Sequence, residues 1–170
     1  MTTLDSPEST SVLTMAQARK AMIVSQLRTS GVNAPFVLRR MGAVAREDFV
    51  PADSRNIAYM DRAIRLENGG SLPAPLVQGV LLQEANPQGT EHALVIDCGS
   101  GYLAQLLSPL VAQCDRLSVE EALSGKKIKG KADLLLIDGA VEHLPKPVLN
   151  RLADGARIFT GLVEKGITRI

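Results

Sequence analysis

The spacing of apolar residues changes near residue 91. In the first half they recur at helical intervals, as Met15, Ala18 and Met22 do. Thr14 and Gln17 have the spacing of a capping box, so we expect a helix that begins at Thr14 and stops near Gly31. A second helix is predicted from Asn33, with Pro35 in its first turn, to about Gly42.

The following segment mixes short helices with turn residues. REDFVP (46–51) precedes a short predicted helix through Ala58 and Tyr59. Residues 67–75 contain two glycines and two prolines, which predicts an irregular loop. Helical spacing returns from Leu76 to Glu84.

From residue 91 the chain alternates short apolar runs with helical segments. Strands are predicted at 93–97, 116–120, 133–138 and 156–163, and helices at 103–110 and 147–152. Continuous apolar strands are typical of parallel sheets covered on both faces. The fold class is therefore α/β with an N-terminal helical extension. We expect one compact domain: a flexible tail (1–12), the extension with its loop (13–90) and the α/β core (91–170).

Composition narrows the possible partners and locations. The 170 residues are 45% hydrophobic and carry a formal net charge of +1, with no Trp and 3% aromatic residues. This balance argues against nucleic acid as a partner, since neither a basic surface nor aromatic stacking platforms are expected. No apolar run approaches the ~20 residues of a membrane span, and the N-terminus lacks a basic signal region. We expect a cytoplasmic protein with no membrane partner.

Residues that often bind metals or form disulfides are sparse. Cys98 and Cys114 fit neither a disulfide framework nor a CxxC metal site, and Cys98 is predicted to be a small buried residue. His92 and His143 have no ligand-spaced neighbours, so no metal site is predicted. The lysine-rich run 126–131 is expected to be a solvated loop. The alternative is that it binds phosphate or an acidic protein.

The most informative motif is VIDCGSGYLA (95–104), which is predicted to be a strand, a glycine turn and a helix. Such turns let backbone approach a ligand, and the free N–H groups of the following helix favour polar or anionic groups. Glu120, predicted at the end of the next strand, is placed to accept hydrogen bonds from ribose hydroxyls. Asp97 before the turn suits a cationic amino group, as in S-adenosylmethionine. Each of the two carboxylates has an alternative structural role, for Asp97 the capping of the turn.

Longer stretches of the chain resemble the protein-L-isoaspartate O-methyltransferase family. The resemblance runs over about residues 15–163 and is most specific before the glycine turn. The stretches that carry it are Gln26-Leu27-Arg28, Gly31-Val32, Val37-Leu38, Met41, Arg46 to Pro51, Ala58-Tyr59-x-Asp61-Arg62, the 69–77 loop, VIDCGSGYL, LSVE, residues 133–138 and LPKPVLNRLADGARI.

This resemblance implies a class I methyltransferase sheet and methyl transfer from S-adenosylmethionine to the α-carboxyl group of L-isoaspartyl residues in damaged proteins. A protein or peptide bearing such residues is then the expected partner. Ser71 would face the substrate carboxylate. The candidate cofactor-binding residues are Asp97, Gly99, Ser100, Gly101, Glu120 and Asp138, the last because it ends a strand at the ligand-binding edge of the sheet. Capping or solvation is an equally good reading of Asp138.

The chain departs from the family pattern in four places. Pro73 stands where the family has a second hydroxyl, and the glycine turn is shorter by two residues. Only residues 121–132 separate Glu120 from the next strand, where the family has a helix, a strand and another helix, so the adenine side is expected to be open. The chain also ends where the family adds a closing β-hairpin, which indicates a shortened member or a fragment.

Two other functions remain open from the sequence. The departures favour a catalytically impaired methyltransferase-like interaction module. Gly99-x-Gly101-x-x-Ala104 also matches the dinucleotide fingerprint of a nicotinamide-dependent oxidoreductase, which Asp97 disfavours. The oligomeric state is not predicted.

Overall fold

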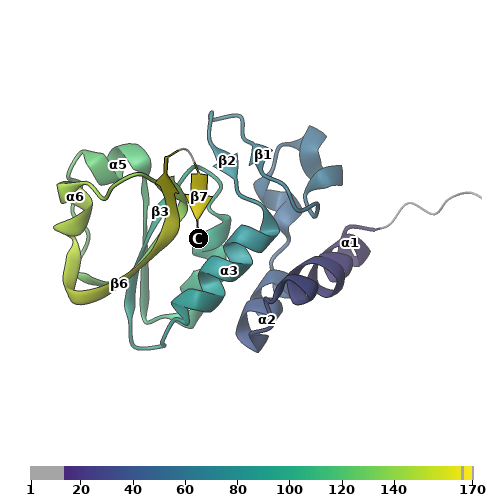
Figure 1. Ribbon diagram of the computed structural model, residues 1–170, viewed down its shortest axis with the longest axis horizontal. Helices are drawn as coiled ribbons and strands as arrows, with labels where there is room; N and C mark the ends of the chain where they lie inside the picture. Colours follow the sequence, from purple (N-terminus) through teal and green to yellow (C-terminus); the bar gives the residue numbers. More distant parts are fainter. Residues whose placement is uncertain (1–13, 166, 170) are drawn as a thin grey trace, which may run out of the picture.

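A computed structural model describes residues 14–165 and 167–169; the predicted tail (1–12) lies outside them. The chain begins with α1 (Met15–Met22), which continues through η1 (Ile23–Leu27) and η2 (Arg28–Ser30), and then forms α2 (Pro35–Ala43). Two 3₁₀ segments follow, η3 (Arg46–Phe49) and η4 (Ala52–Ile57). A small hairpin of β1 (Ile64–Arg65) and β2 (Ser71–Leu72) leads into α3 (Pro75–Ala85), which lies between the sheet and the N-terminal helices (Figure 1).

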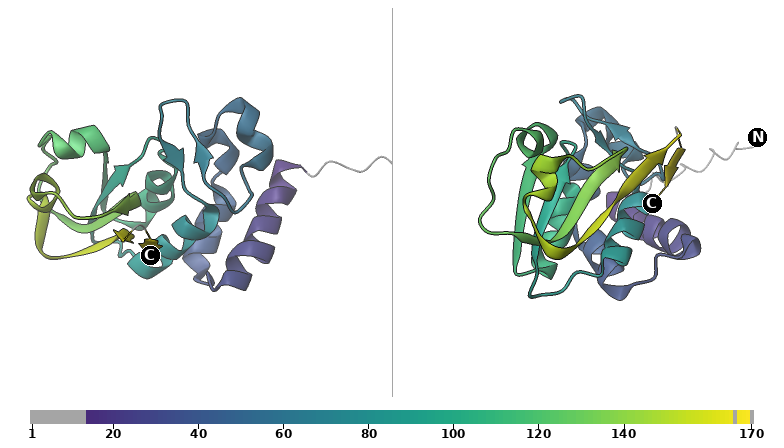
Figure 2. Two further views of the ribbon diagram at one scale, coloured as in Figure 1. Left: turned by 45° about the horizontal axis from the view of Figure 1, so that its top comes forward. Right: turned by 60° about the vertical axis from the view of Figure 1, so that its left-hand side comes forward.

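The core is a five-stranded sheet of order β4-β3-β5-β6-β7. Its elements are β3 (His92–Asp97), α4 (Tyr102–Leu107), η5 (Ser108–Leu110), β4 (Gln113–Ser118), α5 (Val119–Leu123), β5 (Ala132–Val141), α6 (Lys146–Leu149), β6 (Leu152–Glu164) and β7 (Ile167–Arg169). All strand pairs are parallel except β6–β7, in which β7 returns along the end of β6 (Figure 2). The predicted α/β class and helical extension are confirmed.

Alternate residues of the central strands supply the two faces of the sheet. Ala93 and Val95 face the large core beneath α3, α4 and the N-terminal helices, whereas Leu94 and Ile96 face a smaller core beneath α5 and α6. Both sets are fully or almost fully buried, which is why the strand reads as a continuous apolar run. Figure 1 shows α5 and α6 on the side of the sheet opposite to α3.

The helix boundaries follow local chemistry. The side chain of Thr14 accepts a hydrogen bond from Gln17 N–H (3.2 Å) and the side chain of Gln17 accepts one from Thr14 N–H (2.8 Å), which confirms the capping box. Gly31 ends this helical segment in the left-handed region, at φ 91°. The second helix begins at Pro35 and is capped by Ala34, so the prediction of a start at Asn33 was two residues early. Proline is favoured at this first position because its missing N–H has no partner there anyway.

Several other boundaries differ from those expected. The second strand of the core is Gln113–Ser118, which begins three residues before the predicted start. It ends two residues before the predicted end, because Ser118 caps α5 with a capping box to Glu121. The loop at 67–75 was predicted to be irregular, but Ser71 and Leu72 pair with Arg65 and Ile64. The chain does not stop at its fourth core strand, since β7 adds an antiparallel edge.

The short connection after β4 carries the chain past β3 to β5, as its length allows. The side chain of Arg151, a residue that is only 6% exposed, holds this connection in place. Its guanidinium donates to the backbone carbonyls of Glu121 (3.1 Å) and Ala122 (2.8 Å) in α5, of Lys126 (2.7 Å) in the loop, and of Pro147 (2.5 Å) in α6. One side chain thus bonds carbonyls of two very short helices and of the loop between them.

Candidate functional site

The glycine turn after β3 is organised around Asp97. One carboxylate oxygen accepts from Gly99 N–H (2.9 Å) and Ser100 N–H (3.1 Å), and the other from Gly101 N–H (2.8 Å) and Arg116 Nε (2.5 Å). Asp97 is buried, whereas half of the Arg116 side chain is exposed at the edge of the sheet. All four acceptor positions of the carboxylate are therefore occupied by groups of the chain itself.

This arrangement leaves fewer free N–H groups than expected at the turn and at the start of the following helix. The three turn amides bond Asp97, and Tyr102 N–H bonds the Ser100 hydroxyl (3.2 Å). A pyrophosphate would have to displace a buried carboxylate from those donors. The geometry therefore disfavours a nicotinamide dinucleotide at this turn.

The loop of the β1–β2 hairpin lies directly against the turn. Asn68 donates from Nδ2 to the carbonyl of Gly99 (3.3 Å) and accepts at Oδ1 from Gly70 N–H (3.0 Å). A Cβ at Gly70 would lie 1.7 Å from the Cys98 carbonyl oxygen, so only glycine fits there. The hairpin and the turn thus form one wall, built from segments about 30 residues apart.

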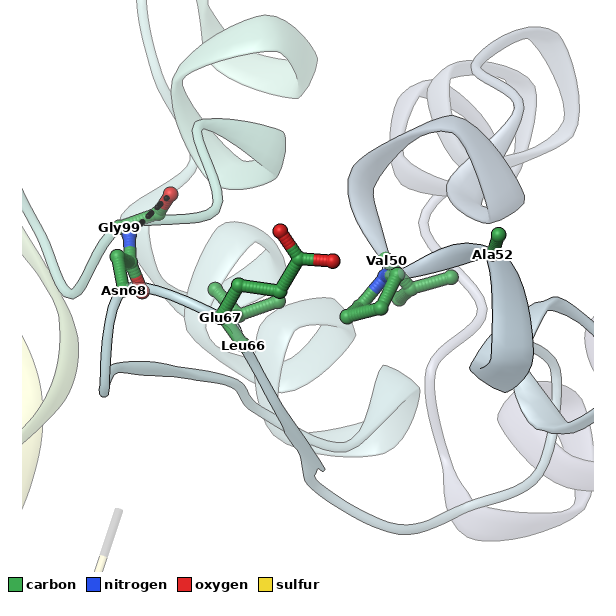
Figure 3. A pocket seen from close by; sticks show the side chains of 7 residues that line it. Val50, Ala52, Leu66, Glu67, Asn68 and Gly99 are labelled. Atoms are coloured by element: carbon green, nitrogen blue, oxygen red, sulfur yellow. Dashed lines mark hydrogen bonds between the residues drawn. The ribbon is translucent and has the colours of Figure 1, made fainter.

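Two clefts share Asn68 and Gly99 in this wall. One, of about 470 Å³, lies between the hairpin loop, the glycine turn and the start of α5, and its lining includes Gly70, Asp97 and Glu120. The other, of about 430 Å³, lies between the same hairpin loop and the Val50–Ala52 segment. Figure 3 shows the Glu67 side chain extending from the hairpin toward Val50 and Ala52. We call these the turn cleft and the Glu67 cleft.

The predicted cofactor residues divide into two groups. Asp97, Gly99 and Glu120 line the turn cleft. Glu120 lies in the first turn of α5 and not at the end of a strand, so its predicted position in the secondary structure was wrong. Its side chain is exposed, and among the described residues no side-chain bond to its carboxylate is present. The carboxylate is therefore available to a ligand in the cleft.

The other predicted residues lie around that cleft, and their roles stay predictions. Gly101 is buried, and a Cβ there would meet Arg116 Nη1 at 3.1 Å. Ser100 Oγ lies 3.4 Å from Asp138 Oδ2, and Asp138 is 1% exposed beneath the turn. Ser71 is exposed on β2, one residue from Gly70, but it is not part of the lining of either cleft.

A buried polar network extends from Asp138 to the N-terminal extension. Gln78 Nε2 donates to both Asp138 oxygens (2.9 and 3.0 Å), and Gln78 Oε1 accepts from Arg46 Nη1 (2.5 Å). Arg46 also donates to the carbonyls of Ala58 (2.8 Å) and Pro73, and its guanidinium lies 5.1 Å from the centre of the Tyr102 ring. Arg46 and Gln78 have no exposed surface.

Burial changes the ionisation of this network. It raises the pKa of Asp138 from 3.8 to about 6, with the neighbouring Asp97 charge adding to the rise and the Gln78 hydrogen bonds opposing it. Burial also lowers the pKa of Arg46. A carboxyl group with such a pKa beneath a cleft is a feature of functional sites, although structural networks show it too.

A second cluster fixes α1 to this region. Tyr59 donates to Glu47 and accepts from Arg19 Nε (2.7 Å), while Arg19 Nη2 bonds Glu47 (3.0 Å). Burial and the bond to Glu47 raise the pKa of Tyr59 to about 12. Burial opposes the charge of Glu47, but its bonds from Tyr59 and Arg19 lower its pKa overall.

Sequence reasoning missed Asn68 and Gln78. Asn68 precedes two glycines, a signal that indicates a turn but not the segment that the turn contacts. Gln78 is a single polar position on the apolar helix α3, and its burial is the only clue that it bonds other polar groups.

Other classes of site are not found in the part of the chain that the structure describes. No group of three or more His, Cys, Asp or Glu side chains is arranged to hold a metal ion. Cys98 and Cys114 are free and partly buried, and burial raises the pKa of both thiols. No described helix has the length and apolar character needed to cross a membrane. Lys126 pairs with Glu121, and Lys131 donates to the Asn150 carbonyl.

Comparison with known proteins places the chain in a family. A sequence model of the protein-L-isoaspartate(D-aspartate) O-methyltransferase family matches residues 17–132. A protein-L-isoaspartate O-methyltransferase of Aeropyrum pernix is 34% identical over 171 residues, covering 84% of this chain and 65% of that protein. A second relative, protein-L-isoaspartate O-methyltransferase 2 of Anaeromyxobacter, is 27% identical and covers 82% of this chain and 68% of its own length. The chain thus spans about two thirds of these relatives.

The fold also matches a solved structure. A crystal structure from Plasmodium falciparum, described as a protein-L-isoaspartate O-methyltransferase in complex with S-adenosyl-L-homocysteine, superposes with a TM-score of 0.67 at 15% identity. The match covers 88% of this chain and 86% of that one, and it confirms the methyltransferase fold. Because the family model covers most of the chain, this protein belongs to the protein-L-isoaspartate(D-aspartate) O-methyltransferase family.

Proposed function

We propose that this chain transfers a methyl group from S-adenosylmethionine to the free carboxylate of L-isoaspartyl residues in proteins or peptides. The observation that carries the proposal is the turn cleft, which joins the glycine turn of a family member to the exposed carboxylate of Glu120. S-adenosylmethionine supplies an electrophilic sulfonium methyl group. Every other requirement falls on binding and orientation by the chain.

The residues of the turn cleft fit this group. A carboxylate accepts hydrogen bonds from ribose hydroxyls, and Glu120 presents one whose oxygens are not used within the described chain. Gly99, with φ of 112°, is needed because a Cβ there would lie 2.2 Å from Asn68 Nδ2, so its absence lets the Asn68 loop close against the turn and complete the lining of the cleft. Because the Asp97 carboxylate already bonds the turn amides, they are not offered to a phosphate, which favours a ligand that carries none.

The acceptor needs no general base. A carboxylate with an ordinary pKa near 3.5–4 is already ionised at neutral pH. The chain then contributes by holding donor and acceptor in line and excluding water, an effect worth up to ~7–11 kcal/mol in well-oriented systems. Ser71 is the expected donor to the substrate carboxylate, because it stands on the hairpin that forms one wall of the turn cleft. Glu67 supplies the one charged side chain of the Glu67 cleft, which is unsuited to an anionic acceptor.

Calorimetric titration with S-adenosylhomocysteine tests the cofactor site. We expect wild-type protein to bind one equivalent and Glu120→Ala to bind roughly ten- to hundred-fold more weakly, since it loses charge-assisted hydrogen bonds. Glu84→Ala is the matched control, because Glu84 is an exposed carboxylate on α3 away from the cleft. Absence of binding by the wild-type protein would refute the proposal.

Methylation of an isoaspartyl peptide, with the normal aspartyl peptide as the negative substrate, tests the acceptor site. Ser71→Ala should raise KM for the isoaspartyl peptide by roughly ten-fold, through loss of a hydrogen bond to a charged group. Ser25→Ala changes an exposed serine on η1 and should leave KM unchanged. Equal KM values for wild type and Ser71→Ala would remove Ser71 from the site.

A further inference from the structure

Gln78 is a fully buried amide with a charged group bonded at each end. Its oxygen accepts from Arg46 Nη1 (2.5 Å), and its nitrogen donates to the two oxygens of Asp138 (2.9 and 3.0 Å). An amide suits this place because arginine offers only donors and a carboxylate only acceptors. The two partners therefore also fix the orientation of the amide.

Both charged groups are bonded onward, one toward the hairpin and the other toward the glycine turn. Arg46 donates to the carbonyl of Pro73, two residues after Ser71. Asp138 lies 3.4 Å from the hydroxyl of Ser100 in the glycine turn. A continuous series of polar contacts therefore runs from the end of the hairpin, through Arg46, Gln78 and Asp138, to the glycine turn that lines the turn cleft.

We propose, on the basis of the methyl-transfer function above, that Gln78 is a positioning residue that sets the Ser71–Pro73 segment relative to the glycine turn. It touches neither substrate nor cofactor, and it acts by keeping Arg46 and Asp138 at a fixed separation. Without the amide, Arg46 and Asp138 are no longer bonded to a common side chain. The Ser71–Pro73 segment and the glycine turn are then no longer held at a fixed distance from each other. The expected consequence is poorer binding of the isoaspartyl substrate with little change at the cofactor.

The charged groups around Asp138 make the network responsive to pH. Asp97 on β3 opposes its ionisation, Arg46 on η3 favours it, and the Gln78 bonds from α3 and the Ser100 hydroxyl also favour it. The Cys98 thiol lies close enough to Asp138 for its own pKa to be raised by that charge. Loss of the Gln78 bonds therefore raises the pKa of Asp138 further.

The chain contains an internal reporter of Arg46. It has two tyrosines and no tryptophan, and both tyrosines contact this arginine. Tyr59 Oη accepts from Arg46 N–H (3.2 Å), and the Arg46 guanidinium lies 5.1 Å from the centre of the Tyr102 ring. Tyrosine fluorescence thus reports on the Arg46 end of the network, while Asp138 titrates at the other end.

The first experiment follows tyrosine fluorescence against pH in wild type, Gln78→Met and Gln83→Met. Wild type should show a transition with a midpoint near 6 that Asp138→Asn abolishes. Gln78→Met should lose most of its amplitude, since the two ends are no longer connected. Gln83→Met is the matched control, because Gln83 lies on the same helix but bonds Asn33, Ala34 and Gly31. It should keep the wild-type transition even if it lowers stability.

The second experiment separates positioning from a purely structural role by kinetics. Gln78→Met should raise KM for an isoaspartyl peptide about ten-fold while kcat and the calorimetric Kd of S-adenosylhomocysteine stay within about three-fold. If Gln78→Met does not fold, Gln78→Asn replaces it with the same expectation, because its shorter amide does not span both partners.

The two experiments fail in different ways. A wild-type protein that binds no S-adenosylhomocysteine refutes the proposed function, and the pH experiment then still decides whether Gln78 connects the two ends. A folded Gln78 variant with the wild-type fluorescence transition and the wild-type KM overturns the positioning role. A wild-type transition that is absent, or that survives Asp138→Asn, also overturns it.

Discussion

Among the residues whose burial is described, each face of the central sheet has one buried arginine, and the two side chains are bonded in different ways. On the α3 face, Arg46 bonds Gln78 and two carbonyls and lies in a network that contains the Asp138 carboxylate. On the α5–α6 face, Arg151 bonds four backbone carbonyls, and no described carboxylate accepts from it. The first arginine connects the parts of the site, whereas the second holds short segments of chain in place.

The two arginines differ in the groups that compensate their buried charge. Burying a cation costs several kcal/mol unless its donors and its charge are compensated. Arg46 is compensated by Asp138 and by the face of the Tyr102 ring, so its energy depends on the ionisation of other groups. Arg151 is compensated by carbonyls in the last turn of α5 and in α6, which carry the negative end of the helix dipole and do not titrate.

Removing Arg46 should have the largest effect on stability. Arg46→Met keeps much of the volume but leaves Gln78 Oε1 and the carbonyls of Ala58 and Pro73 without this donor. It also removes the positive charge that favours ionisation of Asp138. We expect a loss of about 3–5 kcal/mol in the free energy of unfolding, measured by urea denaturation. Arg55→Met, at an exposed arginine on η4, is the control. A loss below about 1 kcal/mol would show that the network contributes little to stability.

The ionisation of Asp138 should have the next largest effect on the free energy of unfolding. This effect depends on pH in the opposite direction to that of a salt-bridged carboxylate. Its pKa is raised from 3.8 to about 6, so the folded protein binds the proton more tightly than the unfolded chain. The stability that this group contributes is therefore complete below pH 3.8 and is lost as the pH rises to about 6. At neutral pH the ionisation of Asp138 therefore lowers the free energy of unfolding by about 3 kcal/mol relative to a pH below 3.8.

Asp138→Asn isolates this contribution. The variant should gain stability relative to wild type as the pH rises from 4 to 7, and the difference should level off above the folded pKa of about 6. The comparison with wild type at each pH is needed because Glu47, whose pKa is lowered, contributes in the opposite direction in acid. A difference that does not change with pH would mean that Asp138 ionises as in the unfolded chain.

The fold was largely predictable because its signals are local. Apolar runs marked the strands, and the capping box at Thr14 marked the first helix, since each depends on residues adjacent in the sequence. The errors occurred where a competing local motif decided the boundary. Ser118 caps α5 and so ends β4, which moved Glu120 from a strand end into a helix. The hairpin pairing of Ser71 with Arg65 depends on contact between two-residue strands, which carry no periodicity.

The site was only partly predictable, because its main contacts join distant segments. The motif placed Asp97, Gly99 and Glu120 together, and all three line the turn cleft. The motif did not show that Asp97 would use the turn amides, nor that the Asn68 loop would lie against Gly99. Gln78 and Asp138 are 60 residues apart, and nothing in either local sequence indicates the other.

Removing Arg151 should have the smallest of these effects and should be confined to its own face. Arg151→Met leaves four carbonyls to be solvated, and because these lie near exposed loop residues, water can replace part of the lost bonding. We expect a loss of about 2 kcal/mol, together with faster hydrogen exchange in α5 and residues 124–131. Lys127→Met, at an exposed position in the same loop, is the control. The Asp138-dependent pH profile should stay unchanged in Arg151→Met. If that profile shifts, the two faces are coupled through the sheet. Arg46 and Arg151 would then not have the separate roles described above.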